Sequence, residues 1–247
     1  MKLSVNLNKI ALLRNARGEN YPNLKHYANL AIDCGVNGLT LHPRPDHRHA
    51  TSDDVINLCK LSKERNVEFN IEGNPFSMKH GDFLGFLELV DIIKPDQITL
   101  VPDLIDQITS DHGWVSGSHD DDLKSKIKSL KKLSPSSKIS IFIDCIEGVD
   151  YASKMGADLI EIHTGEFSNR IANNDFSAIV KVSEIINKAK SYDLLINAGH
   201  DLNLQNLSFL VEIGDINEVS IGHAIIIDSL NYGFKETISK YLNIIGN

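Results

Sequence analysis

One unit recurs along the whole chain: a short apolar or alternating run ends in polar or glycine residues, and a helical pattern follows it. β-Branched and aliphatic residues dominate these runs, which is typical of parallel strands that are covered on both faces. Eight runs have this character, at residues 3–8, 38–44, 67–73, 97–103, 139–144, 159–165, 194–200 and 218–224. The recurrence predicts eight parallel strands, each followed by a crossover helix.

Helical periodicity fills the segments between the runs. Apolar residues spaced three and four apart occupy stretches near 24–31, 52–59, 176–186 and 234–242, and Ser52 is expected to be an N-cap. Eight strand–helix units predict an α/β chain that forms a single (β/α)8 TIM barrel with additional helices, one domain over residues 1–247. An open doubly wound sheet is the alternative, although no G-x-G-x-x-G follows the first run.

Charge and cysteine content restrict the partners and the compartment. The net charge of −8 argues against a nucleic-acid or membrane-surface binder. Three cysteines without a C-x-x-C motif predict no disulfide framework and no zinc knuckle, which suits a reducing cytoplasm. No run approaches the ~18 apolar residues of a membrane-spanning helix, and the first residues lack a signal-peptide pattern.

Polar residues stand at the carboxyl end of each predicted strand. In a closed barrel these ends meet at one mouth, where barrel enzymes hold their active sites. The residues expected there are Asn6, Asn8, His42, Arg44, Glu72, Asp103, Asp144, Glu161, His163, Asn197, His200, Gly222 and His223.

Histidine and carboxylate side chains at this mouth predict proton transfer. His42 opens the stretch H-P-R-P-D-H-R-H (residues 42–49), and histidine can act as a general acid or base near neutral pH. Glu72 ends the strand pattern F-N-I-E-G, where burial would raise its pKa and make it a proton shuttle. Glu161 lies between isoleucines. For each of the two glutamates a structural partner is the alternative, and His47 and Arg48 are expected to lie in solvent.

Glycine and arginine residues predict phosphate binding. Gly199 and Gly222 follow the last two strands, where this fold commonly holds phosphate on backbone N–H groups and a helix N-terminus. Arg14 and Arg17 follow the first strand and would grip a phosphate or form surface ion pairs. Arginine and lysine in one mouth repel a cation and no H-E-x-x-H motif occurs, so a metal site is the less favoured alternative.

Two long segments are expected to be loops that close over the mouth. They cover residues 104–122 and 165–175, and the first contains the single tryptophan of the chain. Loops of this length beside an active site often exclude water from the reaction.

Seven segments together resemble one known family. They are V-N-L-N-K-I-A-L-L-R-N-A-R-G, H-P-R-P-D-H-R-H, F-N-I-E, L-V-P-D with Q-I-T-S-D, I-E-I-H-T-G, N-A-G-H and S-I-G-H-A-I. In this order, and over essentially the whole chain, they resemble the pyridoxine 5′-phosphate synthase family of the deoxyxylulose-dependent route to vitamin B6.

The resemblance implies a homo-octameric barrel that needs no metal and no organic cofactor. The implied reaction condenses two phosphorylated small molecules, 3-amino-2-oxopropyl phosphate and 1-deoxy-D-xylulose 5-phosphate, into pyridoxine 5′-phosphate. It also implies roles for particular residues. The acid/base residues are His42, Glu72 and His200, with Glu161 stabilising the transition state; the aminoketone phosphate ligands are Asn6, Arg17, Gly222 and His223; the deoxyxylulose phosphate ligands are Arg44, His49 and Thr109.

The chain departs from the common family pattern at the first strand and after two later ones. Asn8 and Lys9 stand where the pattern has Asp and His that contact the deoxyxylulose phosphate, and Pro45 replaces a Glu. Asp201 stands where the pattern has a phosphate-binding glycine, and a carboxylate is unfavourable beside phosphate. Asn8, Lys9 and Asp201 are still expected to be binding residues of the site, although their side chains differ from those of the family pattern.

Two other functions remain as alternatives. The first is a metal-dependent sugar isomerase or phosphate-ester hydrolase on the same barrel. The second is a catalytically retired barrel that senses a phosphorylated ligand or a B6 vitamer, which the departures at Asn8, Lys9 and Asp201 would explain.

Overall fold

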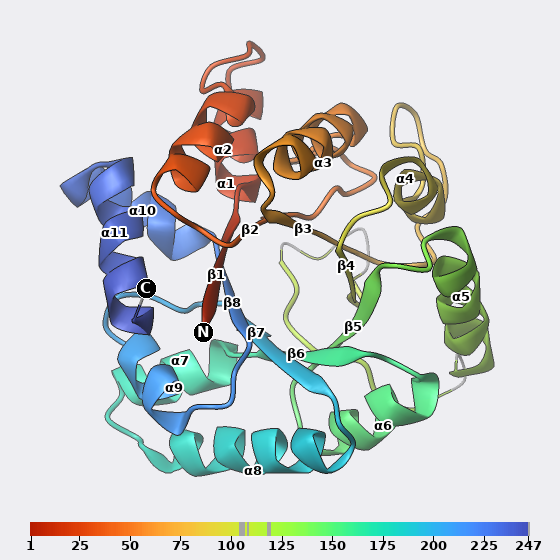
Figure 1. Ribbon diagram of the computed structural model, residues 1–247, viewed down its shortest axis with the longest axis vertical. Helices are drawn as coiled ribbons and strands as arrows, with labels where there is room; N and C mark the ends of the chain where they lie inside the picture. The colour runs from red at the N-terminus through yellow and green to blue at the C-terminus, as the bar shows by residue number, and fades with distance from the viewer. Residues whose placement is uncertain (104–106, 108, 118–119, 247) are drawn as a thin grey trace.

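A closed barrel of parallel strands forms the centre of the structure (Figure 1). The computed structural model describes residues 1–103, 107, 109–117 and 120–246, and within them eight strands pair in chain order, with β8 returning to β1. The strands are β1 (Lys2–Asn6), β2 (Gly38–Leu41), β3 (Glu68–Gly73), β4 (Gln97–Leu100), β5 (Lys138–Ile143), β6 (Leu159–His163), β7 (Leu195–Gly199) and β8 (Glu218–Ile221). Leu3 of β1 pairs with Val219 of β8, which closes the ring and excludes the open sheet.

Helices surround the strands, as the predicted (β/α)8 architecture requires (Figure 1). They are α1 (Asn8–Asn15), α2 (Leu24–Asp33), α3 (Ser52–Arg65), α4 (Phe86–Ile93), α5 (Asp120–Leu133), α6 (Glu147–Met155), α7 (Gly165–Ala172), α8 (Ser177–Ser191), α9 (Leu207–Ile213), α10 (His223–Tyr232) and α11 (Phe234–Ile245). Strand β1 is followed by α1 and α2, β6 by α7 and α8, and β8 by α10 and α11, so the prediction of additional helices is confirmed.

Two local predictions are wrong. The N-cap of α3 is Thr51 and not Ser52: the Thr51 hydroxyl accepts from the Asp54 N–H, and the Asp54 carboxylate accepts from the Thr51 N–H, so the pair forms a capping box. Residues 165–175 are not a long loop, because α7 occupies most of this segment and buries Phe167 and Ile171.

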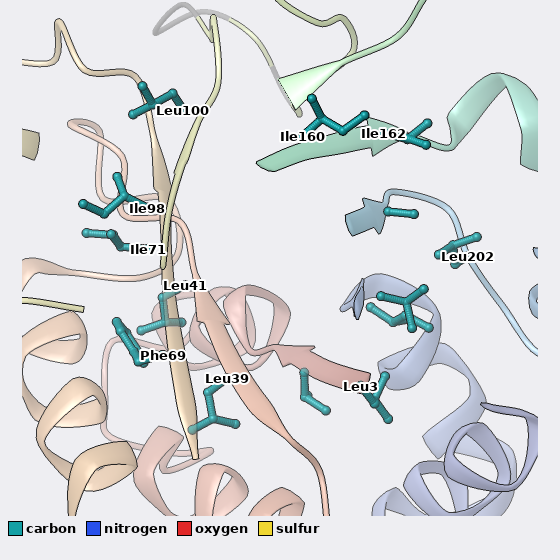
Figure 2. Packing of buried hydrophobic residues seen from close by; sticks show 14 of the residues in the cluster. Leu3, Leu39, Leu41, Phe69, Ile71, Ile98, Leu100, Ile160, Ile162 and Leu202 are labelled. Atoms are coloured by element: carbon teal, nitrogen blue, oxygen red, sulfur yellow. The ribbon is translucent and has the colours of Figure 1, made fainter. Parts of the chain in front are cut away.

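The hydrophobic core is a ring between the strands and the helices. Alternate strand residues, among them Leu39, Phe69 and Ile98, are fully buried and belong to one cluster with apolar residues of the helices (Figure 2). Side chains of successive strand residues point to opposite faces, so the other half of each strand faces the inside of the barrel.

The inside of the barrel is polar. The Ser4 and Thr40 hydroxyls of β1 and β2 lie 2.7 Å apart and are fully buried. Some hydrogen bonds join strands that are not neighbours and therefore cross the interior; among them, Thr99 donates to Glu161 (3.3 Å) and Asn197 donates to Gln97 (3.1 Å). Barrels of this class usually fill this space with bulky apolar residues, whereas here a hydrogen-bonded network fills it.

The three cysteines are free, as expected: Cys59 is buried, and Cys34 and Cys145 are partly buried. In the described part of the chain, no helix has the length and apolar character needed to cross a membrane.

Candidate active site

Residues predicted to carry chemistry gather at the carboxyl ends of the strands. His42 follows β2, Glu72 lies near the end of β3, His163 ends β6 and His200 follows β7. Asn197 does not belong to this group, because its amide lies inside the barrel and donates to Gln97. The mouth therefore holds most of the expected residues, and the structure shows how each is held.

His42 is a buried and neutral imidazole between two carboxyl groups. Its Nδ1 lies 3.8 Å from Glu72 Oε2 and its Nε2 lies 3.8 Å from Asp103 Oδ2. Burial lowers its pKa well below the usual value, and the positive charge of Arg44 lowers it further. A neutral ring is able to accept a proton at neutral pH.

Glu72 is a buried carboxyl group whose pKa is raised well above its usual range. Burial is the main cause, followed by repulsion from Glu161 and Asp103. The Asn6 amide donates to Glu72 Oε2 at 3.4 Å. A glutamate in this environment holds its proton at neutral pH and is able to donate it, while its neighbour His42 is able to accept one.

Glu161 lies deeper, where β6 faces the interior. It is 3% exposed, accepts from the Thr99 hydroxyl, and has a pKa raised by burial to about 7. Its position depends on Gly199 of β7, because a Cβ at that residue would lie 2.5 Å from Glu161 Oε1. A carboxyl group that titrates near neutral pH is suited to exchange protons or to stabilise a developing positive charge.

Arg44 forms a buried ion pair that was not predicted from the sequence. Its guanidinium binds Asp103, which also accepts from the Ser110 hydroxyl at 2.7 Å. Arg44 also donates to the Gln107 carbonyl at 3.1 Å. A small hollow opens beside this pair and is lined by His42, Arg44, Asn74 and Asp103 among others.

The stretch after β2 is more buried than predicted. His49 is 9% exposed, and burial together with Arg44 lowers its pKa to about 3. His47 and Arg48 do not lie fully in solvent, which corrects the prediction: the His47 ring packs on Phe83, and Arg48 binds Asp46. Most of the stretch is therefore buried or half-buried.

His200 contacts Thr109, which lies in the segment after β4. Its Nε2 lies 3.0 Å from the Thr109 hydroxyl, and its ring lies 4.6 Å from the ring of His163. Asp201 Oδ2 lies 3.0 Å from Nδ1 of His200. Thr109 was predicted to belong to a closing loop, and parts of that loop, 104–106, 108 and 118–119, lie outside the described residues.

The side chain of Asn8, the first residue of α1, contacts the backbone of His42. Asn8 accepts from the His42 N–H at 3.0 Å, and its own N–H donates to Asn6 at 3.0 Å. Lys9 is partly buried, and its charge is one of the causes that lower the pKa of His49. Both departures from the family pattern therefore lie at the mouth.

Helix α10 begins directly after β8, as predicted for a phosphate site. Gly222 precedes the helix and packs tightly, since a Cβ there would lie 3.0 Å from Asn6 Cβ, and His223 is the first helical residue. Arg14 does not point to a phosphate, because it forms a part-buried pair with Asp54, whereas Arg17 is exposed. Across the described residues, no three His, Cys, Asp or Glu side chains form a cluster that would bind a metal ion.

Comparison with known proteins assigns the chain to a protein family. Residues 3–247 match the protein family described as Pyridoxal phosphate biosynthesis protein PdxJ. The chain belongs to the PdxJ family. Pyridoxine 5′-phosphate synthase of Cytophaga hutchinsonii is 45% identical over 98% of this chain and 97% of that protein. The synthase of Xanthomonas axonopodis pv. citri is 42% identical over 99% of this chain and 96% of that protein.

Solved structures of other proteins share the PdxJ-family barrel at low identity. Thiamine phosphate pyrophosphorylase from Pyrococcus furiosus has a TM-score of 0.61 and 13% identity, over 99% of this chain and 95% of that chain. Tryptophan synthase from M. tuberculosis has a TM-score of 0.62 and 8% identity, over 99% of this chain and 93% of that chain. These likenesses support the barrel fold alone.

Proposed function

We propose that this PdxJ-family chain is a pyridoxine 5′-phosphate synthase. It condenses 3-amino-2-oxopropyl phosphate with 1-deoxy-D-xylulose 5-phosphate and releases pyridoxine 5′-phosphate, inorganic phosphate and water. One observation carries the proposal beyond family membership: a neutral buried histidine lies 3.8 Å from a carboxyl group that holds its proton. Imine formation, dehydration and ring closure each need a base and an acid in this arrangement.

The proton-transfer roles follow from the protonation states. His42 is the base and Glu72 the acid at one side of the mouth, and His200 serves the other side beside Thr109. Glu161, which has a pKa of about 7, stabilises the transition state from its position in the barrel interior. Buried walls keep water from the reactive intermediates.

The two phosphates bind at separate places in this proposal. The aminoketone phosphate lies at the start of α10, on the backbone of Gly222 and His223, with Asn6 beside it and Arg17 folding in from the segment that follows α1. The deoxyxylulose phosphate lies near Arg44, His49 and Thr109, where it competes with Asp103 for the Arg44 guanidinium. Asn8 and Lys9 complete that side. The enzyme needs no metal or organic cofactor, and it works as a cytoplasmic homo-octamer of single-domain chains.

A turnover assay tests the proposal. Purified protein receives both phosphorylated substrates, with and without a chelator, and pyridoxine 5′-phosphate is followed by fluorescence or mass. His42→Ala and Glu72→Gln are expected to lower kcat by at least ~100-fold, whereas Glu88→Gln, an exposed change on α4, should leave it unchanged.

Each outcome assigns one function. Product that resists chelation and depends on His42 and Glu72 supports the synthase. Loss of activity with the chelator would favour a metal-dependent enzyme. Binding of the substrates without turnover by folded wild-type protein would favour the sensor.

A further inference from the structure

His200 and Asp201 occupy an unusual stretch of backbone after β7. Their φ angles are 89° and 55°, so two consecutive residues other than glycine adopt the left-handed region. This region costs roughly 1–2 kcal/mol per residue for most side chains, although aspartate and asparagine tolerate it better. The Thr164 hydroxyl donates to the Gly199 carbonyl at 2.8 Å and to the His200 carbonyl at 2.5 Å, which fixes the turn. A strained backbone that its surroundings hold in place is often part of a functional site.

The turn directs the Asp201 carboxylate onto the His200 ring. Oδ2 of Asp201 lies 3.0 Å from Nδ1, which is buried. The two atoms lie within ion-pair distance, although their geometry is not that of a hydrogen bond. The opposite nitrogen, Nε2, lies 3.0 Å from the Thr109 hydroxyl. Each ring nitrogen therefore has one polar group beside it.

The charges around the ring favour an ionised Asp201. Its pKa lies below the usual range, chiefly because of the side-chain interaction with His200. On the other sides of His200 lie the His163 ring and the Glu161 carboxyl group, and the aspartates 111 and 144 act on His163. An ionised carboxylate can only accept a hydrogen bond, so the nitrogen that faces it must carry the proton.

We propose that Asp201 is a positioning residue that keeps a proton on Nδ1 of His200, so that Nε2 presents its lone pair to the substrate. The Thr109 hydroxyl donates to that lone pair while the site is empty, and a substrate hydroxyl or ammonium group takes its place. This role replaces the phosphate contact that the family resemblance implied for position 201, since a carboxylate repels phosphate. The inference rests on the proposed function, because it assigns a task to His200 in that reaction.

The tautomer of His200 can be measured without any turnover. Protein with ¹⁵N-labelled histidine reports which ring nitrogen is protonated, and a His200→Gln sample assigns the signal. The wild type is expected to show Nδ1–H. Asp201→Gly removes the carboxylate and suits the left-handed backbone, so the protein should fold with its stability intact while the Nδ1–H form loses its dominance. Asp201→Asn keeps an acceptor oxygen and should fall between the two.

Kinetics then separates positioning from substrate binding. Asp201→Gly should lower kcat by about 10- to 100-fold, part of the ~10²–10⁴-fold that general acid–base catalysis supplies. KM should not rise for either substrate, since a glycine at this position binds phosphate in the family pattern. Asp215→Asn is the matched control, because Asp215 is also a left-handed aspartate with φ of 58° and only an exposed pair with Lys190. It should change neither the tautomer nor kcat.

The proposal is wrong if the wild-type ring carries its proton on Nε2, or if Asp201→Gly leaves the tautomer unchanged. A variant in which KM alone changes would also overturn it and would assign Asp201 to substrate binding. If the wild type makes no product, the proposed function fails, but the tautomer measurement still decides whether Asp201 orients His200.

Discussion

Glu218 provides a test of the polar barrel interior that is independent of catalysis. It begins β8, is 6% exposed, and accepts from the Asn197 amide at 3.4 Å. Burial, followed by repulsion from Glu68 and Glu161, raises its pKa from 4.5 to about 8. The folded protein therefore holds this proton at pH values where the unfolded chain has lost it.

The size of the effect follows from proton linkage. Between pH 4.5 and about pH 8 only the folded state binds the proton, so the free energy of unfolding falls as the pH rises, by about 1.4 kcal/mol per pH unit. The stabilisation is fully present below the unfolded pKa and is lost by the folded pKa. Over the whole interval the loss amounts to about 5 kcal/mol. Glu218→Gln is neutral at every pH, so it escapes this loss and still accepts from Asn197.

Urea unfolding from about pH 5 to about pH 9 measures the effect. The fluorescence of Trp114, which is buried, reports the transition. Glu218→Gln should match the wild type near pH 5 and exceed it by several kcal/mol near pH 8. Glu88→Gln is the control, because Glu88 is exposed on α4. A difference between Glu218→Gln and the wild type that stays constant with pH would refute the reasoning, and so would a less stable variant at pH 8.

Three further predictions concern the mouth of the barrel. Arg44→Ala leaves the Asp103 carboxylate buried without its main partner and should lower the free energy of unfolding by about 3–5 kcal/mol, measured in urea; Arg44→Ala combined with Asp103→Ala should recover part of this loss, and no recovery would contradict the pairing argument. Gly199→Ala places a Cβ 2.5 Å from Glu161 Oε1, so we expect a cost of about 1–3 kcal/mol in thermal unfolding and a fall in kcat; unchanged turnover would show that the Glu161 carboxyl need not stay in place. Turnover should not respond to chelators, and recovery of a chelated sample by a divalent cation would contradict this.

The barrel could be predicted because its signal is distributed along the chain. Each strand run carries apolar residues on its outer face, and the repetition of the unit identifies the architecture even where a strand such as β2 ends earlier than expected. Segment 165–175 was mistaken for a loop because it is largely polar, yet Phe167 and Ile171 lie four residues apart and bury one helical face. That spacing was the signal that the prediction missed.

The residues that belong to the site could be predicted from the sequence, but the pairs that their side chains form could not. Strand ends identify His42, Glu72 and His200 because a barrel brings all such ends together. Which side chain binds which depends on loop conformation, and the Arg44–Asp103 pair joins residues 59 apart. The polar interior was also missed, because a polar residue inside an apolar run does not reveal whether it faces the barrel or the helices.

The left-handed turn at position 201 also limits how the chain can vary there. A φ of 55° favours glycine, asparagine and aspartate over almost every other residue. In the genetic code an aspartate codon becomes a glycine or an asparagine codon by a single base change. Single mutations can therefore replace one of these residues by another at this position. Glycine offers a backbone contact to phosphate, asparagine a neutral acceptor and aspartate a charged one, and each of them suits the turn, so the chain still folds.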